Sequence, residues 1–326
     1  MARGILAPKG EAGLTLIEMM VALAIGSFLI IGAVQIYTQS RQSYIVNESV
    51  AKVQDTATFA MDAIEADLRM ASNWGRTSRA LTIEGRSIIG NANPSGIPGI
   101  PEACGEDWVL NLAMSVDGDN NGYALPCGTT ATRQANSDHL IVSRATAEPV
   151  VPEPCRPQIQ TWLIVGQIFT DGKVPAGFTA ADSSTHNLLV SSYYVADDSD
   201  LIPGVPSLRR RALRMNGGTA SIVDEEIAPG VENQQVQFGI DVNEDNTVDR
   251  YVNPGDGIYD PTDTNYIPGA RVITARVWLV VRSFDIEVGL VDDVAYAPGD
   301  VNLGQFNDQF RRMQVSKTIL LRNARS

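Results

Sequence analysis

The chain has 326 residues and carries 25 basic against 38 acidic side chains, which leaves a formal charge of −13. This charge argues against a protein that holds nucleic acid or an anionic membrane surface, because both require a strongly positive face. A zinc scaffold built from Cys and His is disfavoured, because its four ligands would use nearly all of the three cysteines and two histidines. The length allows one or two packed domains.

The amino terminus joins a short charged segment to a long apolar run. Arg3 and Lys9 precede Gly13, and residues 14–34 contain only three strongly polar side chains. About 20 apolar residues span the roughly 30 Å hydrocarbon core of a bilayer, and the two basic residues favour a cytoplasmic amino end. A secretory signal is cleaved beyond its apolar stretch. Here the small residue Gly13 comes before that stretch, so cleavage there would leave the helix attached.

The segment Gly13–Glu18, with the sequence GLTLIE, resembles the class III leader junction of type IV prepilins and type II secretion pseudopilins. In that family prepilin peptidase cuts after the glycine and methylates the new amino terminus, and the acid at the fifth mature position is kept for assembly. The resemblance therefore implies processing between Gly13 and Leu14 and an assembly role for Glu18. Leu14 departs from the usual phenylalanine.

The position of Glu18 inside an apolar segment also indicates a role on physical grounds. A carboxylate within a bilayer helix costs about 2.5 to 3.5 kcal/mol on insertion scales, so it needs a partner. After cleavage, the ammonium group of Leu14 would lie one turn away, and the same group on an adjacent subunit could neutralise Glu18 when helices bundle. The alternative is an acid near the interface that snorkels to water and has no role in assembly.

The helical pattern continues well beyond the membrane segment. Apolar residues recur at spacings of three and four as far as Met70, and no Pro or Gly occurs between Ala33 and Trp74. We therefore predict a leader peptide over residues 1–13, a transmembrane and stalk helix over 14–74, and a periplasmic β-rich head over 75–326. A free coiled coil is disfavoured because the heptads are irregular.

Alternation of period two predicts half-buried strands after the helix, most clearly over residues 273–282 and 236–240. Further predicted strands are residues 140–144, 161–169, 188–195, 208–215 and 313–322. The fold class is therefore α+β and pilin-like, with the long N-terminal helix packed on one antiparallel sheet. Long loops are predicted over residues 90–137 and 196–206, which are rich in Gly, Pro, Asn and Asp.

Four segments narrow the resemblance to the PilW family of type IV pilus minor pilins. They are DLRMA over 67–71 followed by Trp74 and Gly75, VENQQVQFGID over 231–241, ARVWLVVRS over 275–283, and RRMQVSKTILLRN over 311–323. The resemblance implies a subunit that primes pilus assembly at the inner membrane with other minor pilins and the major pilin. It further implies a place near the pilus tip beside a large adhesin, and hence roles in cell adhesion and twitching motility.

An acidic loop follows the second of these segments and is a candidate calcium site. Oxygen-bearing side chains stand at positions 1, 3, 5 and 9 of a calcium loop, as Asp241, Asn243, Asp245 and Asp249. However, Asn246 replaces the turn glycine, and Val252 stands where a bidentate Glu would close the site. The alternative is a solvated hairpin tip without Ca²⁺.

The three cysteines allow three different single disulfides in an oxidising periplasm. We predict a bond between Cys104 and Cys127, because both lie in the same Gly- and Pro-rich segment, which leaves Cys155 as a free thiol. The basic run Arg209–Arg211 with Arg214 is either a patch for a partner or the exposed face of an edge strand.

Catalysis is not predicted. His139 precedes a strand with Ser143 nearby, but no nucleophile motif, phosphate loop or metal pair accompanies them, so a hydrogen-bonded structural histidine is favoured. The sequence thus predicts a minor pilin, first in the inner membrane and then in a pilus on the cell surface. Two alternatives stay open: a minor pseudopilin of a type II secretion system, and a calcium-dependent adhesin or enzyme on an uncleaved membrane anchor.

Overall fold

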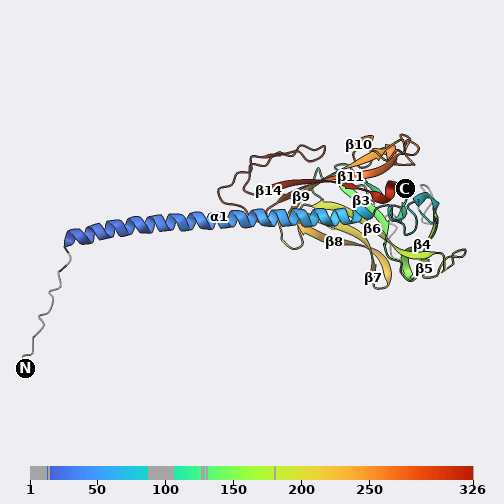
Figure 1. Cartoon of the computed structure of the whole chain (residues 1–326), viewed down its shortest axis with the longest axis horizontal. Helices are drawn as coiled ribbons and strands as arrows, with labels where there is room; N and C mark the ends of the chain where they lie inside the picture. The colour runs from blue at the N-terminus through green and yellow to red at the C-terminus, as the bar shows by residue number, and fades with distance from the viewer. Residues whose placement is uncertain are drawn as a thin grey trace, which may run out of the picture. The chain divides into compact units, whose positions relative to one another are not determined.

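The computed structural model describes residues 13, 15–86, 106–125, 129, 131–179 and 181–325 (Figure 1). The chain divides into two compact units, Met1–Val50 and Ala51–Ser326. Helix α1, Leu16–Met70, contributes its first part to the first unit and its last part to the second.

In the first unit, α1 presents its side chains outward on every face. None of the described side chains between residues 15 and 50 is buried, and large apolar ones such as Leu16 and Phe28 are mostly exposed. Among the described residues, α1 is the one helix long and apolar enough to cross a membrane. An apolar surface of this kind requires lipid or other helices around it.

In the second unit, the last part of α1 buries one face. Its buried apolar residues recur at helical spacing and are Val53, Ala57, Ala60, Met61, Ile64 and Leu68. The helix ends at Met70 because Ser72 adopts a left-handed backbone conformation with φ 62°, and Gly75 follows with φ 97°. The helix thus ends four residues before residue 74, where the predicted helix ended.

Within the described residues, the larger sheet of the second unit has eight strands. They are β1 (Ile83–Glu84), β2 (Val116–Asp119), β3 (His139–Ala145), β4 (Pro154–Trp162), β5 (Val165–Asp171), β6 (Ser184–Ala196), β7 (Ser207–Asn216) and β8 (Thr219–Pro229). The order is β1-β5-β4-β6-β3-β2, with β7 pairing to both β6 and β8. All of these pairings are antiparallel except the one between β1 and β5. A short helix, α2 (Glu106–Leu110), precedes β2.

The smaller sheet has the order β10-β9-β11-β14 and is antiparallel throughout. Its strands are β9 (Val231–Asp241), β10 (Arg250–Val252), β11 (Arg271–Arg282) and β14 (Arg312–Leu320). Between β11 and β14, β12 (Ala295–Tyr296) and β13 (Gly304–Gln305) form a two-stranded ribbon. Single-turn helices complete the unit: η1 (Ala80–Thr82), η3 (Gly257–Tyr259) and η4 (Arg322–Arg325).

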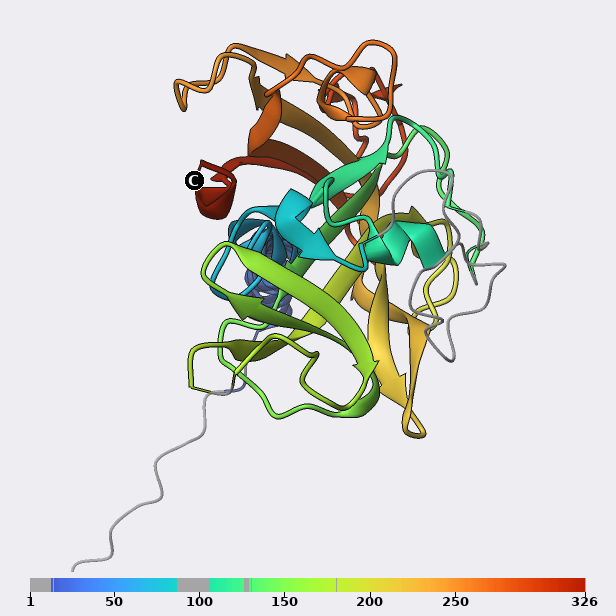
Figure 2. The same ribbon diagram turned by 90° about the vertical axis from the view of Figure 1, so that its right-hand side faces the viewer.

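The last part of α1 lies in the core between the two sheets. Its buried face joins one cluster with Val142 of β3, Tyr193 of β6 and Phe238 of β9, and Figure 2 shows the helix nearly end on between the sheets. Polar contacts fix its position: Tyr193 Oη donates to Asp67 at 2.7 Å, and Lys317 of β14 pairs with Glu65. The α+β fold with a long helix on antiparallel strands is thus confirmed.

The prediction of a single sheet is wrong. Residues 219–241 form two long strands, β8 and β9, which belong to different sheets. The chain passes from one sheet to the other at Gly230, whose φ of 93° suits glycine, and a Cβ there would meet Phe284 at 2.8 Å. Each sheet can therefore cover its own side of the helix.

The strand predicted over residues 161–169 is also wrong. Trp162 ends β4 and Val165 begins β5, so the apolar residues between them form the turn of a hairpin. Leu163 has a φ of 50°, which an extended strand does not allow. An uninterrupted apolar run was typical of a strand, and nothing in its composition marked the reversal of direction.

Candidate functional site

The first turn of α1 brings Thr15 and Glu18 together. The Glu18 carboxylate accepts hydrogen bonds from the Thr15 backbone N–H and from Thr15 Oγ1, both at 2.9 Å. In return, Thr15 Oγ1 accepts a bond from the Glu18 backbone N–H at 3.3 Å. This reciprocal pattern is a capping box, in which side chains satisfy backbone donors that the helix start leaves without partners.

Glu18 is also isolated electrostatically. It is the only charged side chain between residues 15 and 40. A single carboxylate in so long an apolar segment is costly in lipid unless a cation or a set of donors accompanies it. In the unprocessed chain Thr15 supplies such donors. A cationic partner for Glu18 would have to come from another subunit.

The predicted processing residues lie directly before this turn. Gly13 is exposed, and apart from its two chain neighbours no described atom lies within 4 Å of the position that a Cβ would occupy there. Leu14 lies outside the described residues. The pairing of its freed ammonium group with Glu18 therefore stays a prediction.

Two protein-family models match this chain, one over its amino terminus and one over much of the two sheets. The prokaryotic N-terminal methylation motif matches residues 8–34, which include Gly13, Thr15 and Glu18. The family described as type IV pilus-assembly protein W, PilW, matches residues 192–323, from the middle of β6 through the whole smaller sheet to η4. These two matches support a member of the PilW family.

The PilW match and the class III leader together support a type IV pilus minor pilin. The leader implies processing by prepilin peptidase and assembly with other pilins, and the apolar α1 accounts for anchoring in the inner membrane. A pilin is a structural subunit, which agrees with an association role. Comparison with curated proteins gave no match.

The candidate calcium loop of the pilin connects β9 to β10, and its oxygens already have partners within the chain. Asp241 accepts from the Asn246 backbone N–H at 2.9 Å and pairs with the Arg271 guanidinium at 3.1 Å. Asp249 accepts from the backbone N–H of Val242 at 2.8 Å. Burial opposes ionisation of Asp241, but these hydrogen bonds together hold the pKa of its carboxyl below the ordinary value.

These contacts define what calcium would have to displace. Among the described residues, no group of three or more His, Cys, Asp and Glu side chains is arranged to hold a metal ion. Arg271 already neutralises Asp241, and a hard cation would compete with it for the same oxygens. Calcium binding by Asp241, Asn243, Asp245 and Asp249 stays a prediction. It would be established by a stability gain on calcium titration that disappears in both Asp241→Ala and Asp245→Ala.

The predicted disulfide partners Cys104 and Cys127 both lie outside the described residues. Cys155 lies in β4 as a free, half-buried thiol. The predicted pairing is thus neither confirmed nor contradicted.

The structure assembles a polar constellation that sequence reasoning missed. His139 Nδ1 lies 2.9 Å from Asp119 Oδ2, and His139 Nε2 lies 2.6 Å from Ser192 Oγ. Asp119, His139 and Ser192 belong to the adjacent strands β2, β3 and β6. The order acid, imidazole and hydroxyl is that of a nucleophilic triad, so its accessibility decides what it can do.

The constellation is closed to solvent at the hydroxyl. His139 and Ser192 are both 0% exposed, and the Tyr123 ring lies 4.5 Å from the imidazole, centroid to centroid. Burial lowers the pKa of His139 despite the opposing effect of Asp119. A neutral, enclosed imidazole of this kind ties three strands together. These contacts depend on the register of the three strands, so the sequence alone could not show them. Sequence reasoning pointed to Ser143, and not to Ser192, as the serine near His139.

Proposed function

We propose that this minor pilin primes type IV pilus assembly at the inner membrane and then lies in a minor-pilin complex near the pilus tip, beside a large adhesin. The observation that carries the proposal is the joining of a class III leader and the PilW match in one chain. The leader supplies the means of polymerising, and the PilW segment sets this subunit apart from a generic prepilin.

The proposed orientation follows from charge at the amino end. Arg3 and Lys9 favour the cytoplasm, and α1 is apolar beyond them, so the head lies in the periplasm before assembly. We further propose the domain boundaries stated above, with residues 1–13 removed as the leader and 14–74 retained as the membrane and stalk helix.

The proposed assembly step depends on Glu18. Cleavage after Gly13 creates a positive group at Leu14, and bundling of apolar helices brings this group on one subunit close to Glu18 of the next. Neutralisation of both charges lowers the cost of keeping them in a low-dielectric helix bundle. An unprocessed subunit has no ammonium group at Leu14, so it offers no counter-charge to Glu18 of its neighbour. Assembly is therefore selective for processed subunits.

Deletion of the protein tests the proposal. We expect loss of surface pili and of twitching motility, both restored by the wild-type chain supplied in trans. Immunogold labelling of restored cells should place the head at pilus ends. Normal pili with lost secretion of exoproteins would instead support a pseudopilin, and normal pili with lost adhesion would support a membrane-anchored adhesin.

A further inference from the structure

The head has a preformed surface at the end where α1 stops, built by residues 71–82. The Trp74 backbone N–H donates to Thr77 O at 3.0 Å, and the Arg79 backbone N–H donates to Thr77 Oγ1 at 3.0 Å. The Arg76 backbone N–H donates to Thr161 Oγ1 of β4 at 3.3 Å, which ties this segment to the larger sheet. A surface fixed in this way loses little conformational entropy when a partner binds.

Two arginines of this segment differ from those of the strands. Arg209 and Arg210 of β7 pair with Asp224 and Glu225 of β8, each at 2.9 Å, so the predicted partner patch there is satisfied internally. Arg76 and Arg79 are exposed, and neither forms a salt bridge with any residue that the structure describes. Arg76 Nη1 donates to the backbone oxygen of Asp182 at 2.6 Å, which holds the guanidinium in place without neutralising its charge. In a chain of net charge −13, such positive groups attract an acidic partner.

Exposed apolar side chains lie beside these guanidinium groups. The β4–β5 turn presents Leu163 and Ile164, 63% and 52% exposed, next to Trp162 at 43%. Leu81 of η1 is 63% exposed, and its neighbour Thr82 donates its hydroxyl to Ile164 O, which joins the two segments. Single exposed apolar residues are ordinary, but a contiguous group of four marks an interaction surface.

A hollow of about 370 Å³ lies between the arginines and the hairpin turn. Its lining includes Arg76, Arg79, Ile164 and Asn323. Asn323 also lines a neighbouring cavity of about 190 Å³. The two hollows thus form adjoining depressions at the same end of the head.

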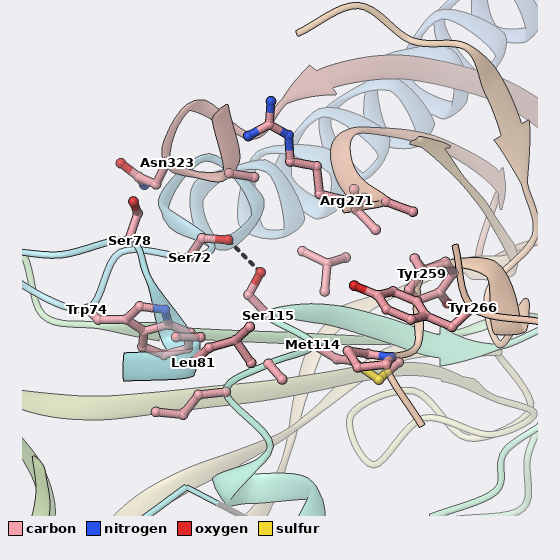
Figure 3. Close-up of a pocket in the computed structure, with 18 residues that line it drawn as sticks. Ser72, Trp74, Ser78, Leu81, Met114, Ser115, Tyr259, Tyr266, Arg271 and Asn323 are labelled. Carbon is pink, nitrogen blue, oxygen red and sulfur yellow. Dashed lines mark hydrogen bonds between the residues drawn. The ribbon is translucent and has the colours of Figure 1, made fainter. Parts of the chain in front are cut away.

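The neighbouring cavity contains a donor without an acceptor. Figure 3 shows Trp74 at its wall, together with Ser78, Leu81 and Asn323. The Trp74 indole is fully buried, and its Nε1–H has no hydrogen-bond partner among the described residues. A buried donor left in this state costs free energy, which an acceptor from a bound segment would recover.

We infer that this end of the head docks a protein segment that presents carboxylates beside apolar side chains. The carboxylates pair with Arg76 and Arg79, since guanidinium groups favour planar, charge-assisted bonds to carboxylates. The apolar side chains pack on Leu163, Ile164 and Trp162, and Trp and Arg are among the residue types enriched in interface hot spots. The inference rests on the proposed function, because a subunit near the tip requires a surface for the protein beside it.

Photocrosslinking of the full-length pilin in piliated cells tests the inference. The variant Leu163→p-benzoylphenylalanine is irradiated, and Leu201, a residue after β6 that is 72% exposed, carries the same group in the control. We expect a protein adduct from position 163 alone. Mass spectrometry should place its crosslink within a few residues of Asp or Glu in an apolar segment of the partner.

Charge variants give the decisive comparison. Arg76→Glu with Arg79→Glu should lower the adduct yield at least about fivefold, and the milder glutamine pair should lower it less. Arg250→Glu, at an exposed arginine on β10, should leave the yield unchanged. The abundance of each variant in sheared pili is also measured. If the glutamate pair is depleted from pili because it folds poorly, the adduct yield of the glutamine pair decides the test.

Several results would overturn the inference. They are an adduct with phospholipid, a crosslinked segment that is basic, a yield unaffected by charge reversal, and no adduct although the pilin is present in pili. Absence of the wild-type pilin from pili would instead contradict the proposed function, so the two failures are distinguishable.

Discussion

Thr15 and Glu18 hold each other at the start of α1, with each side chain bonded to the backbone N–H of the other. This contact gives Glu18 two possible roles, which lead to different phenotypes. As a cap, the carboxylate only stabilises the first turn of its own helix. As an assembly residue, it must meet a positive group created by processing.

Mass measurement of the mature chain tests processing. We predict a polypeptide that begins at Leu14 and carries one methyl group on its amino nitrogen, because the methylation motif spans Gly13 and Glu18. Gly13→Val should block cleavage, since a β-branched side chain stands at the scissile bond. A mature chain beginning at Met1 or beyond Val34 would contradict the assembly role as well.

Substitution of Glu18 separates capping from assembly. We predict that Glu18→Ala leaves cleavage near normal but lowers the pilin content of sheared pili severalfold, because the freed ammonium group loses its counter-charge. Thr15→Ala is the matched control, since it removes the threonine hydroxyl from the capping box and keeps the charge. Equal losses in both variants would show that capping alone accounts for the effect.

The position of α1 between the sheets depends on Asp67. This carboxylate accepts from Tyr193 Oη at 2.7 Å and pairs with Arg144 at 2.9 Å, with only 9% of its side chain exposed. Asp67→Ala leaves both donors without their acceptor and should cost about 2 to 4 kcal/mol of unfolding free energy. Asp62→Ala, on the same helix with a side chain 63% exposed, should cost less than about 0.5 kcal/mol. Urea unfolding of the full chain in detergent measures both.

Much of the fold could be predicted from the sequence where local pattern and tertiary environment agree. The helix was predictable because no Gly or Pro interrupts its spacing between Ala33 and Met70, and β11 because its alternate residues face one core. Strand β8 was missed because residues such as Glu225 make it polar, and the partners that neutralise them lie on β7. The exchange of sheets at Gly230 depends on packing against Phe284, which no local pattern encodes.

The functional residues also differ in how far the sequence alone could reveal them. Glu18 could be singled out because a lone acid in an apolar segment is conspicuous in the sequence, and its assembly role stays a prediction. The contacts of Asp119 with His139 and of His139 with Ser192 could not be recognised in this way, because they depend on the register of three strands. The same holds for Arg76 and Ile164, which line one hollow although 88 positions separate them in the sequence.

The stability of the head should depend on pH through Asp138. Burial raises the pKa of this carboxyl to about 7, although the Val236 and Asn121 backbone N–H groups donate to it at 2.7 and 2.8 Å. The folded state therefore binds more protons than the unfolded state between the ordinary pKa of 3.8 and about 7. This carboxyl thus lowers stability as pH rises through that window, by up to about 1.4 kcal/mol per pH unit.

The variant Asp138→Asn isolates this contribution. We predict that its unfolding free energy relative to the parent rises between pH 5 and pH 8, because the ionisable group is gone. A comparison with the parent is needed because the pKa of His139 is lowered, which gives the opposite slope. A constant difference across the range would mean that Asp138 is not protonated in the folded head near neutral pH.

The buried hydroxyl of Ser192 supplies the last prediction. Its contact with His139 places base and hydroxyl as in a serine hydrolase, but neither residue is exposed to solvent, and Tyr123 lies against the imidazole. We therefore predict that the native pilin is not labelled by a fluorophosphonate probe that labels an active hydrolase in the same sample. Ser192→Ala should leave piliation unchanged and lower stability by about 1 kcal/mol, since His139 loses one hydrogen bond. Labelling that disappears in Ser192→Ala would instead reveal an opening of the head that exposes the constellation, because a phosphonate can react only with an accessible, activated oxygen.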